Sequence, residues 1–274
     1  MEDIAATLTI NLLPMPVKRL FSLNSLRLRQ FAFLLILFSA CNSNRDYDLS
    51  YTWSEIKVSS DIEGSEKIES IISPYRARLD STMNEVIGYT LHDLTTKGQY
   101  ESTLGTFVTQ LTLTQSISSY QRDVDVAIMN HQGGLRAPIN EGPITIGEIF
   151  QVMPFENDVV LLEIQGDLLL EVIKYIGQSG RSMIWPVSFE VDESGVRNIL
   201  LDGNKIDEDK LYTLSASDYL ANGGSGFHML TSLKRLDIDV VKLRDMIVQE
   251  VKRRTAEGDS IKVEIPNNVT VLAL

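Results

Sequence analysis

Residues Val159 to Ile176 read VVLLEIQGDLLLEVIKYI, and this stretch decides the fold. Its first six residues, VVLLEI, are a short apolar run, which predicts a β-strand. From Asp167 onward the apolar residues recur at the spacing of one helix face, which predicts a helix that ends at Gly177. The residues on that face are Leu168, Val172 and Ile176. A strand that passes directly into a helix predicts a fold that combines the two.

The N-terminal side of this stretch continues the alternation. Asp125 to Met129 (DVAIM) predicts a strand that runs into a sharp turn at Gly133-Gly134. Ile144 to Val152 predicts a short helix, because Thr145 can cap its first turn.

Two longer helices are predicted nearer the N-terminus. Apolar residues recur at helical spacing through residues 62–86, where Pro74 is expected to kink the helix or to start a second one. A further amphipathic helix is predicted from about Ser102 to Thr114. Tyr51 to Val58 (YTWSEIKV) has the character of a strand.

The C-terminal side is predicted to hold more strands and a last helix. The strands expected there are Val187–Val191, Ile199–Leu201 and Tyr212–Ala216. Asp202-Gly203 is a predicted hairpin turn, and a helix over about Val240 to Thr255 is followed by a closing strand, Ile261 to Ile265. Helices and strands alternate without a strict βαβ rhythm, so the expected fold class is α+β, a single mixed α/β domain over residues 51–274.

The composition is that of a folded, acidic protein. Of the 274 residues, 43% are hydrophobic and 23% are charged, and the formal net charge is −12. Such an excess of carboxylates repels polyanions, so no nucleic-acid partner is expected. A small phosphate ester is not excluded, because one or two placed arginines can override the overall field.

The N-terminal residues have the features of a secretion signal. An apolar run from Phe31 to Ala40 (FAFLLILFSA) follows several basic residues and is too short to cross a bilayer. Ser39-Ala40-Cys41 resembles the bacterial lipobox, in which the cysteine is lipidated. We therefore expect residues 1–40 to be an N-terminal extension with a lipoprotein signal peptide, Cys41 to carry the lipid and residues 41–50 to form a tether. The expected location is the bacterial cell envelope, with the membrane reached only through the lipid anchor; the alternative is a buried apolar segment with an ordinary cysteine.

Three short motifs further along the chain carry residues suited to binding a ligand. Residues 130–138 read NHQGGLRAP, residues 154–157 read PFEN and residues 218–227 read DYLANGGSGF. Gly133 and Gly134 allow the backbone to turn tightly beside a ligand. Arg136 offers a planar fork of donors that matches a phosphate, although an isolated arginine is more often a surface ion pair.

In their order and spacing, these motifs resemble the C-terminal domain of the 5′-nucleotidase family, which also includes UDP-sugar hydrolases and cyclic-nucleotide phosphodiesterases. The family patterns are roughly N-x-G-G-[IL]-R, P-F-x-N and [FY]-L-A-x-G-G-D-G-[FY], and the resemblance covers about residues 55–272. It implies a nucleotide or nucleoside as the ligand. Arg136 and Asn130 would bind phosphate, Phe155 and Tyr219 would clamp the base, and Asn157 would contact the base edge. The ribose side would be formed by Asn222, Gly223, Gly224 and Ser225.

This sequence departs from the family pattern at several positions. Ser225 stands where the family usually has an aspartate that binds ribose hydroxyls. The first motif has one residue too many, so that either Gln132 is an insertion or His131 takes the place of Asn130. An earlier family segment appears as GQYESTLGT from Gly98, where Gly98 replaces the family arginine; the neighbouring Lys97 could substitute as a point charge but is not a bidentate fork.

The family's metal-binding motifs are also missing from the sequence. Its three histidines, His92, His131 and His228, do not have the spacing of a two-metal phosphatase centre. We therefore expect no catalytic residue and no cofactor in this chain, and two divalent metals in a separate metallophosphatase chain. Whether the chain counts as an enzyme stays open. The alternatives are a non-catalytic nucleoside- or nucleotide-binding lipoprotein and a decayed domain kept for structure.

Overall fold

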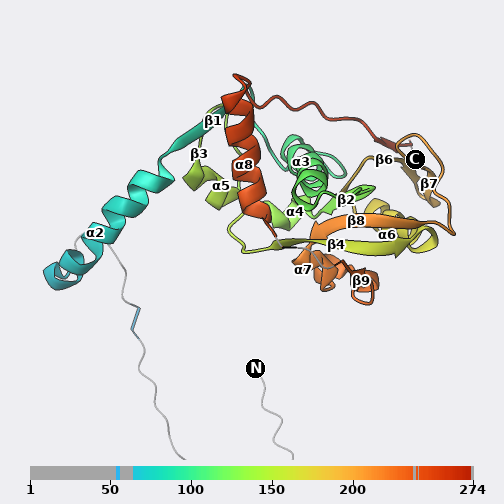
Figure 1. Ribbon diagram of the computed structural model, residues 1–274, viewed down its shortest axis with the longest axis horizontal. Helices are drawn as coiled ribbons and strands as arrows, with labels where there is room; N and C mark the ends of the chain where they lie inside the picture. Colours follow the sequence, from blue (N-terminus) through green and yellow to red (C-terminus); the bar gives the residue numbers. More distant parts are fainter. Residues whose placement is uncertain (1–53, 56–63, 237–238, 240, 273–274) are drawn as a thin grey trace, which may run out of the picture. The chain divides into compact units, whose positions relative to one another are not determined.

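A mixed sheet forms the centre of the computed structural model, which describes residues 54–55, 64–236, 239 and 241–272. Its strand order is β10–β4–β8–β2–β5, and β9 also pairs with β4 (Figure 1). The strands are β2 (Val126–Met129), β4 (Asp158–Gln165), β5 (Met183–Trp185), β8 (Leu211–Ser217), β9 (Lys234–Arg235) and β10 (Val241–Lys242). β8 runs parallel to β2 and antiparallel to β4, so the mixed α/β fold class predicted from the sequence is confirmed.

Both faces of this sheet are apolar. All four residues of β2 are buried, and most of β4 is buried as well. One face packs in a core with α3 (Thr103–Tyr120), α5 (Ile146–Val152) and α8 (Leu243–Ala256). The other face packs in a core with α6 (Gly166–Ser179). The continuous apolar run that begins at Val159 is therefore the pattern of a strand covered on both sides.

Two smaller sheets flank the central one. β1 (Val86–Thr90) pairs with β3 (Gly142–Thr145). β6 (Val187–Asp192) pairs with β7 (Gly195–Leu201) and, in parallel, with β11 (Val269–Val271). Asp202 and Gly203 both have positive φ angles, and Leu201 and Asn204 exchange two backbone hydrogen bonds across them, so the predicted hairpin turn is confirmed.

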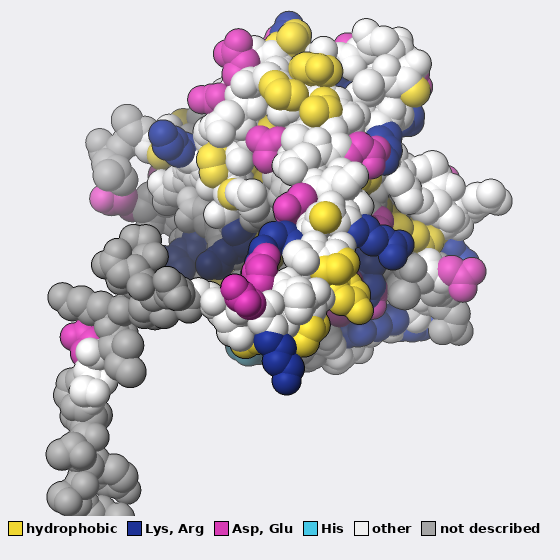
Figure 2. Space-filling view, turned by 90° about the vertical axis from the view of Figure 1, so that its left-hand side faces the viewer, with side chains coloured by type: hydrophobic (Ala, Val, Ile, Leu, Met, Phe, Trp, Pro, Cys, Tyr) yellow, Lys and Arg dark blue, Asp and Glu magenta, His cyan; other side chains and the backbone are white. Residues whose placement is uncertain are grey.

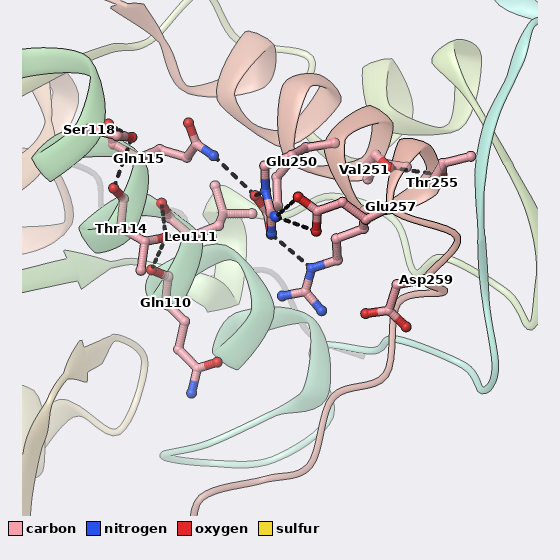
Figure 3. Close-up of polar contacts among 12 residues, drawn as sticks. Gln110, Leu111, Thr114, Gln115, Ser118, Glu250, Val251, Thr255, Glu257 and Asp259 are labelled. Carbon is pink, nitrogen blue, oxygen red and sulfur yellow. Dashed lines mark hydrogen bonds and ion pairs between the residues drawn. The ribbon is translucent and has the colours of Figure 1, made fainter.

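Helices α3 and α8 are joined by a polar cluster. Glu250 on α8 accepts hydrogen bonds from Gln115 on α3 and from Arg253 and Arg254 on its own helix (Figure 3). Burial alone would raise the pKa of Glu250, but these donors outweigh that effect and lower it to about 2. The carboxylate is therefore charged under ordinary conditions and ties the two helices together.

The end of helix α6 differs from the prediction. The helix continues past Gly177 to Ser179 and stops at Gly180, which has the left-handed φ of 60° typical of a helix C-cap. Gly177 lies inside the helix, where an added Cβ would meet the Val196 side chain at 2.3 Å. Its glycine therefore allows close packing of α6 on β7 and does not end the helix.

Three further boundaries were predicted wrongly. Helix α2 (Glu66–Met83) is continuous through Pro74, so no second helix starts there, and Val86 belongs to β1. Helix α3 extends six residues beyond Thr114, and it is not amphipathic, because its first eleven residues are buried around most of the helix surface. Residues 262–268 form no strand; the last strand is β11, while Ile261 makes only an isolated bridge to Thr90.

The N-terminal predictions mostly fall outside the described residues. The described residues from Gly64 onward form one compact unit. Cys41, the signal peptide, the tether and almost all of the predicted strand at 51–58 lie outside the described residues. Among the helices that are described, none combines the length and apolar character needed to span a bilayer. On the face shown in Figure 2, acidic and basic side chains are interspersed.

Candidate functional site

The sheet topology brings the three motifs to one edge. Because β2 and β8 are parallel neighbours, the residues that follow them, Asn130 and the helix α7 (Asp218–Ala221), emerge at the same end. β4 is antiparallel to β8, with Val159 opposite Ser217, so the residues that precede β4 reach that end as well. A hydrogen bond of 3.2 Å from the backbone N–H of Asp158, the residue after the second motif, to Asp218 Oδ1 holds that motif beside the third.

A cleft of about 300 Å³ opens at this edge. It is lined by Asn130, Gln132, Gly133, Gly134, Arg136, Phe155, Asn157, Tyr219 and Ser225. Arg136 is the one charged side chain among these described lining residues. A cavity of this size, with aromatic walls and a few polar groups, is typical of a small-molecule site.

Asn130 and His131 are both buried, but only Asn130 lines the cleft. Asn130 lines the cleft and its Nδ2 donates to Ser225 Oγ at 3.4 Å, while its Oδ1 is buried without a partner among the described residues. His131 is fully buried, and its Nδ1 shares a hydrogen bond of 2.9 Å with Ser102 Oγ. Burial lowers the pKa of His131 to about 4, so its imidazole is neutral. Of the two, Asn130 is therefore the residue placed to meet a ligand.

The turn after Asn130 depends on two glycines. Gly133 has a φ of 93°, a conformation that L side chains rarely adopt, and an added Cβ at Gly134 would lie 2.6 Å from Asn130 Oδ1. The short helix α4 (His131–Gly134) therefore folds back over the asparagine.

Arg136 leaves this turn with its side chain exposed. Its backbone N–H donates to Val152 O at 2.8 Å, which fixes its position against the end of α5. Its guanidinium donates only one hydrogen bond within the described residues, to Gly133 O at 3.2 Å, and forms no ion pair among them. Most donors of the fork are therefore available to an anion in the cleft.

Two aromatic rings line the same cleft. Phe155 is 39% exposed and Tyr219 is 47% exposed, so neither ring is part of the packed core. The half-buried Asn157 lies with them in the lining. Tyr219 is backed by Gly224, where an added Cβ would meet the ring at 2.5 Å, and its hydroxyl accepts a hydrogen bond from the Ser225 N–H at 3.2 Å. Flat, half-exposed rings in a cleft are suited to stacking against a planar ligand.

Several predicted site residues lie outside the lining of the cleft. Asn222 accepts a hydrogen bond from Arg235, Gly223 lies against His228 and Thr231, and Gly224 lies against the Tyr219 ring. Lys97 is exposed and does not line the cleft, so in this structure it does not take the place of the missing family arginine as a phosphate contact. Glu101 of the same segment accepts hydrogen bonds from the backbone N–H groups of residues 268 and 269, which is a structural role.

One lining residue was not predicted. Gln132 was considered only as an insertion, but it lines the cleft and its side chain donates to Gly98 O at 2.9 Å. Its position so soon after Asn130 was the signal that could have identified it. The binding roles assigned to the other residues stay predictions.

The described residues contain no group of three or more His, Cys, Asp or Glu side chains that could hold a metal ion. The described lining of the cleft provides one cation, side-chain amide groups and two aromatic rings.

The chain is similar in sequence to a known family and to several of its members. The family described as "5'-nucleotidase, C-terminal domain" matches residues 82–232, a shorter span than the resemblance suggested. The chain is 30% identical over 114 residues to the protein UshA of Yersinia enterocolitica, covering 40% of this chain and 20% of that protein. It is 25% identical over 223 residues to a snake venom 5'-nucleotidase of Crotalus adamanteus, covering 68% of this chain and 38% of that one. The chain thus spans only a fifth to two fifths of these relatives.

Solved structures share the fold. A 5'-nucleotidase precursor from Thermus thermophilus superposes with a TM-score of 0.63 at 22% identity, covering 75% of this chain and 43% of that one. A NAD nucleotidase from Haemophilus influenzae gives a TM-score of 0.59 at 16% identity, covering 77% and 42%. Since the family match covers more than half of the sequence and contains the residues of the cleft, this chain belongs to the 5'-nucleotidase C-terminal domain family.

Proposed function

We propose that this chain is the nucleotide-recognition domain of a 5′-nucleotidase that works with a separate metallophosphatase chain. The observation that carries the proposal is the cleft in which Arg136 lies with Phe155 and Tyr219. The assembled enzyme would convert a nucleotide and water to a nucleoside and phosphate. The partner would supply two divalent metals, which activate the attacking water and stabilise the leaving oxygen.

Within the cleft, each group has a role that fits its chemistry. Arg136 holds the phosphate with charge-assisted hydrogen bonds, and Asn130 adds an amide beside it. Phe155 and Tyr219 stack on the two faces of the base, and Asn157 pairs with its edge. Ser225 and the glycine loop form the ribose side.

The proposal also covers location. Cys41 would carry a lipid after removal of residues 1–40, and the tether 41–50 would hold the domain at the surface of a bacterial membrane. Anchoring would then come from acyl chains alone, each buried CH₂ contributing about 0.8 kcal/mol.

A reconstitution assay tests the assembly. A metallophosphatase encoded beside this chain is assayed on AMP with and without the chain added. Addition is expected to speed hydrolysis, and Arg136→Met is expected to reduce that gain about tenfold or more, because one charge-assisted contact to phosphate is lost. The matched control is Arg122→Met, at an exposed arginine outside the cleft, which should retain the gain. No acceleration by the unaltered chain would contradict the proposal.

The second candidate is a nucleoside-binding lipoprotein without a catalytic partner. It is favoured by the single cation in the cleft and by a serine at position 225, which weaken phosphate and ribose recognition together. Calorimetry separates the two, since equal affinities for AMP and adenosine would show that Arg136 does not contact phosphate.

A further inference from the structure

The residues that carry the base-binding groups have no regular structure of their own. Residues 153–157 lie between the end of α5 and the start of β4 and belong to neither a helix nor a strand. Phe155 and Asn157 both lie on this segment, which we call the platform loop. A loop that moved freely would have to be ordered each time a ligand bound, at a cost in affinity.

The residues at the start of α8 hold this loop through its backbone. Lys242 Nζ donates to Glu156 O at 3.0 Å, and the Leu243 N–H donates to Asn157 O at 3.0 Å. Arg244 Nη1 donates to Phe155 O at 3.3 Å and, more weakly, to Met153 O at 3.4 Å. Three consecutive residues, far from the loop in the sequence, therefore contact every carbonyl of the loop except that of Pro154.

Arg244 is the centre of this arrangement. Its side chain is only 8% exposed, and its guanidinium lies 4.0 Å from the centre of the Phe150 ring on α5. Its Nη2 pairs with the Glu156 carboxylate, and this contact lowers the pKa of Glu156. The planar guanidinium of Arg244 contacts two carbonyls and a carboxylate at once. The compact ammonium group of a lysine could not make all three contacts.

We propose that Arg244 is a positioning residue for base recognition, which fixes the platform loop so that Phe155 and Asn157 are preorganised in the cleft. This inference rests on the proposed function, because it assumes that the two residues contact a base. Arg244 does not line the cleft and acts only through the loop. Lys242 and Leu243 add to the same restraint.

The test is a calorimetric titration of the full chain and its variants with adenosine and with AMP. Arg244→Met is expected to weaken adenosine binding about tenfold, because the loop must be ordered on binding. It should weaken AMP binding by the same factor, since the backbone of Arg136 is fixed by Val152 O, which belongs to helix α5 and not to the platform loop. The ratio of the two dissociation constants should therefore stay unchanged, whereas a general loss of structure would also erase the phosphate contribution and bring that ratio towards one.

Two further variants keep the outcome decisive. Arg253→Met lies on the same helix but contacts Glu250 and Glu257, so it should leave adenosine affinity unchanged. If Arg244→Met does not fold, Lys242→Met at a more exposed position should still weaken adenosine binding about threefold. Unchanged adenosine affinity in folded Arg244→Met, or in Lys242→Met where the first does not fold, overturns the inference. Failure of the unaltered chain to bind adenosine or AMP overturns the proposed function instead.

Discussion

At the scale of single residues, two residues adjacent in the sequence, Asn130 and His131, have different places relative to the cleft. Asn130 presents its amide to the cleft, while the next residue, His131, is buried against Ser102. The sequence left open which of the two occupies the family position. Only Asn130 lines the cleft, so the geometry favours Asn130 over His131 as the residue that meets a ligand there.

The buried histidine predicts a pH dependence of stability. The folded-state pKa of His131 is about 4, below the unfolded value of about 6.5, so the unfolded chain binds the proton more readily. Its contribution to the free energy of unfolding is present above pH 6.5 and is lost as pH falls towards 4, by about 3 kcal/mol. Urea unfolding of the unaltered chain and of His131→Gln over this range measures it. Parallel pH profiles for the two proteins would contradict the prediction.

At the scale of elements, apolar runs and capping residues were readable from the sequence. The strand from Val159 and the helix capped by Thr145 are both present, the latter with a complete capping box to Glu148. The end of α6 could not be predicted from the sequence. A glycine that allows close packing, such as Gly177, cannot be distinguished there from a glycine that ends a helix. Arg244 was missed for a related reason: it lies in a polar helix outside any motif, and only tertiary packing gives it partners.

The cluster around Glu250 predicts a second, separate effect on stability. Gln115→Ala removes a hydrogen bond of 3.0 Å to this carboxylate and should lower the free energy of unfolding by about 1 kcal/mol at pH 7 (Figure 3). Because the folded pKa of about 2 lies below the unfolded value, the stabilisation is present above pH 4.5 and declines as pH falls towards 2.

Gln110→Ala, on the same helix, is the matched control for this change. Gln110 lies away from Glu250 in Figure 3 and should be close to neutral. Thermal unfolding of both variants between pH 7 and pH 2.5 makes the comparison. A deficit in Gln115→Ala that does not depend on pH would show that Glu250 is not its cause.

At the scale of the whole molecule, the function proposed here depends on convergence at one sheet edge. The three motifs were identifiable from the sequence, and so were most residues of the cleft. That they meet in one cleft was predicted only through the family resemblance, because it follows from the pairing of β8 with both β2 and β4, which no local pattern encodes. Ser225 completes the convergence by linking the loop after α7 to Asn130.

The central claim is that Phe155 and Tyr219 hold one planar base between them beside Arg136. Its most direct test is calorimetric titration of AMP into the unaltered chain and into Phe155→Ala and Tyr219→Ala. Each variant is expected to bind AMP about tenfold or more weakly, since one stacking face contributes roughly 1–3 kcal/mol. Equal AMP affinity in all three proteins, or no binding by the unaltered chain, would contradict the account.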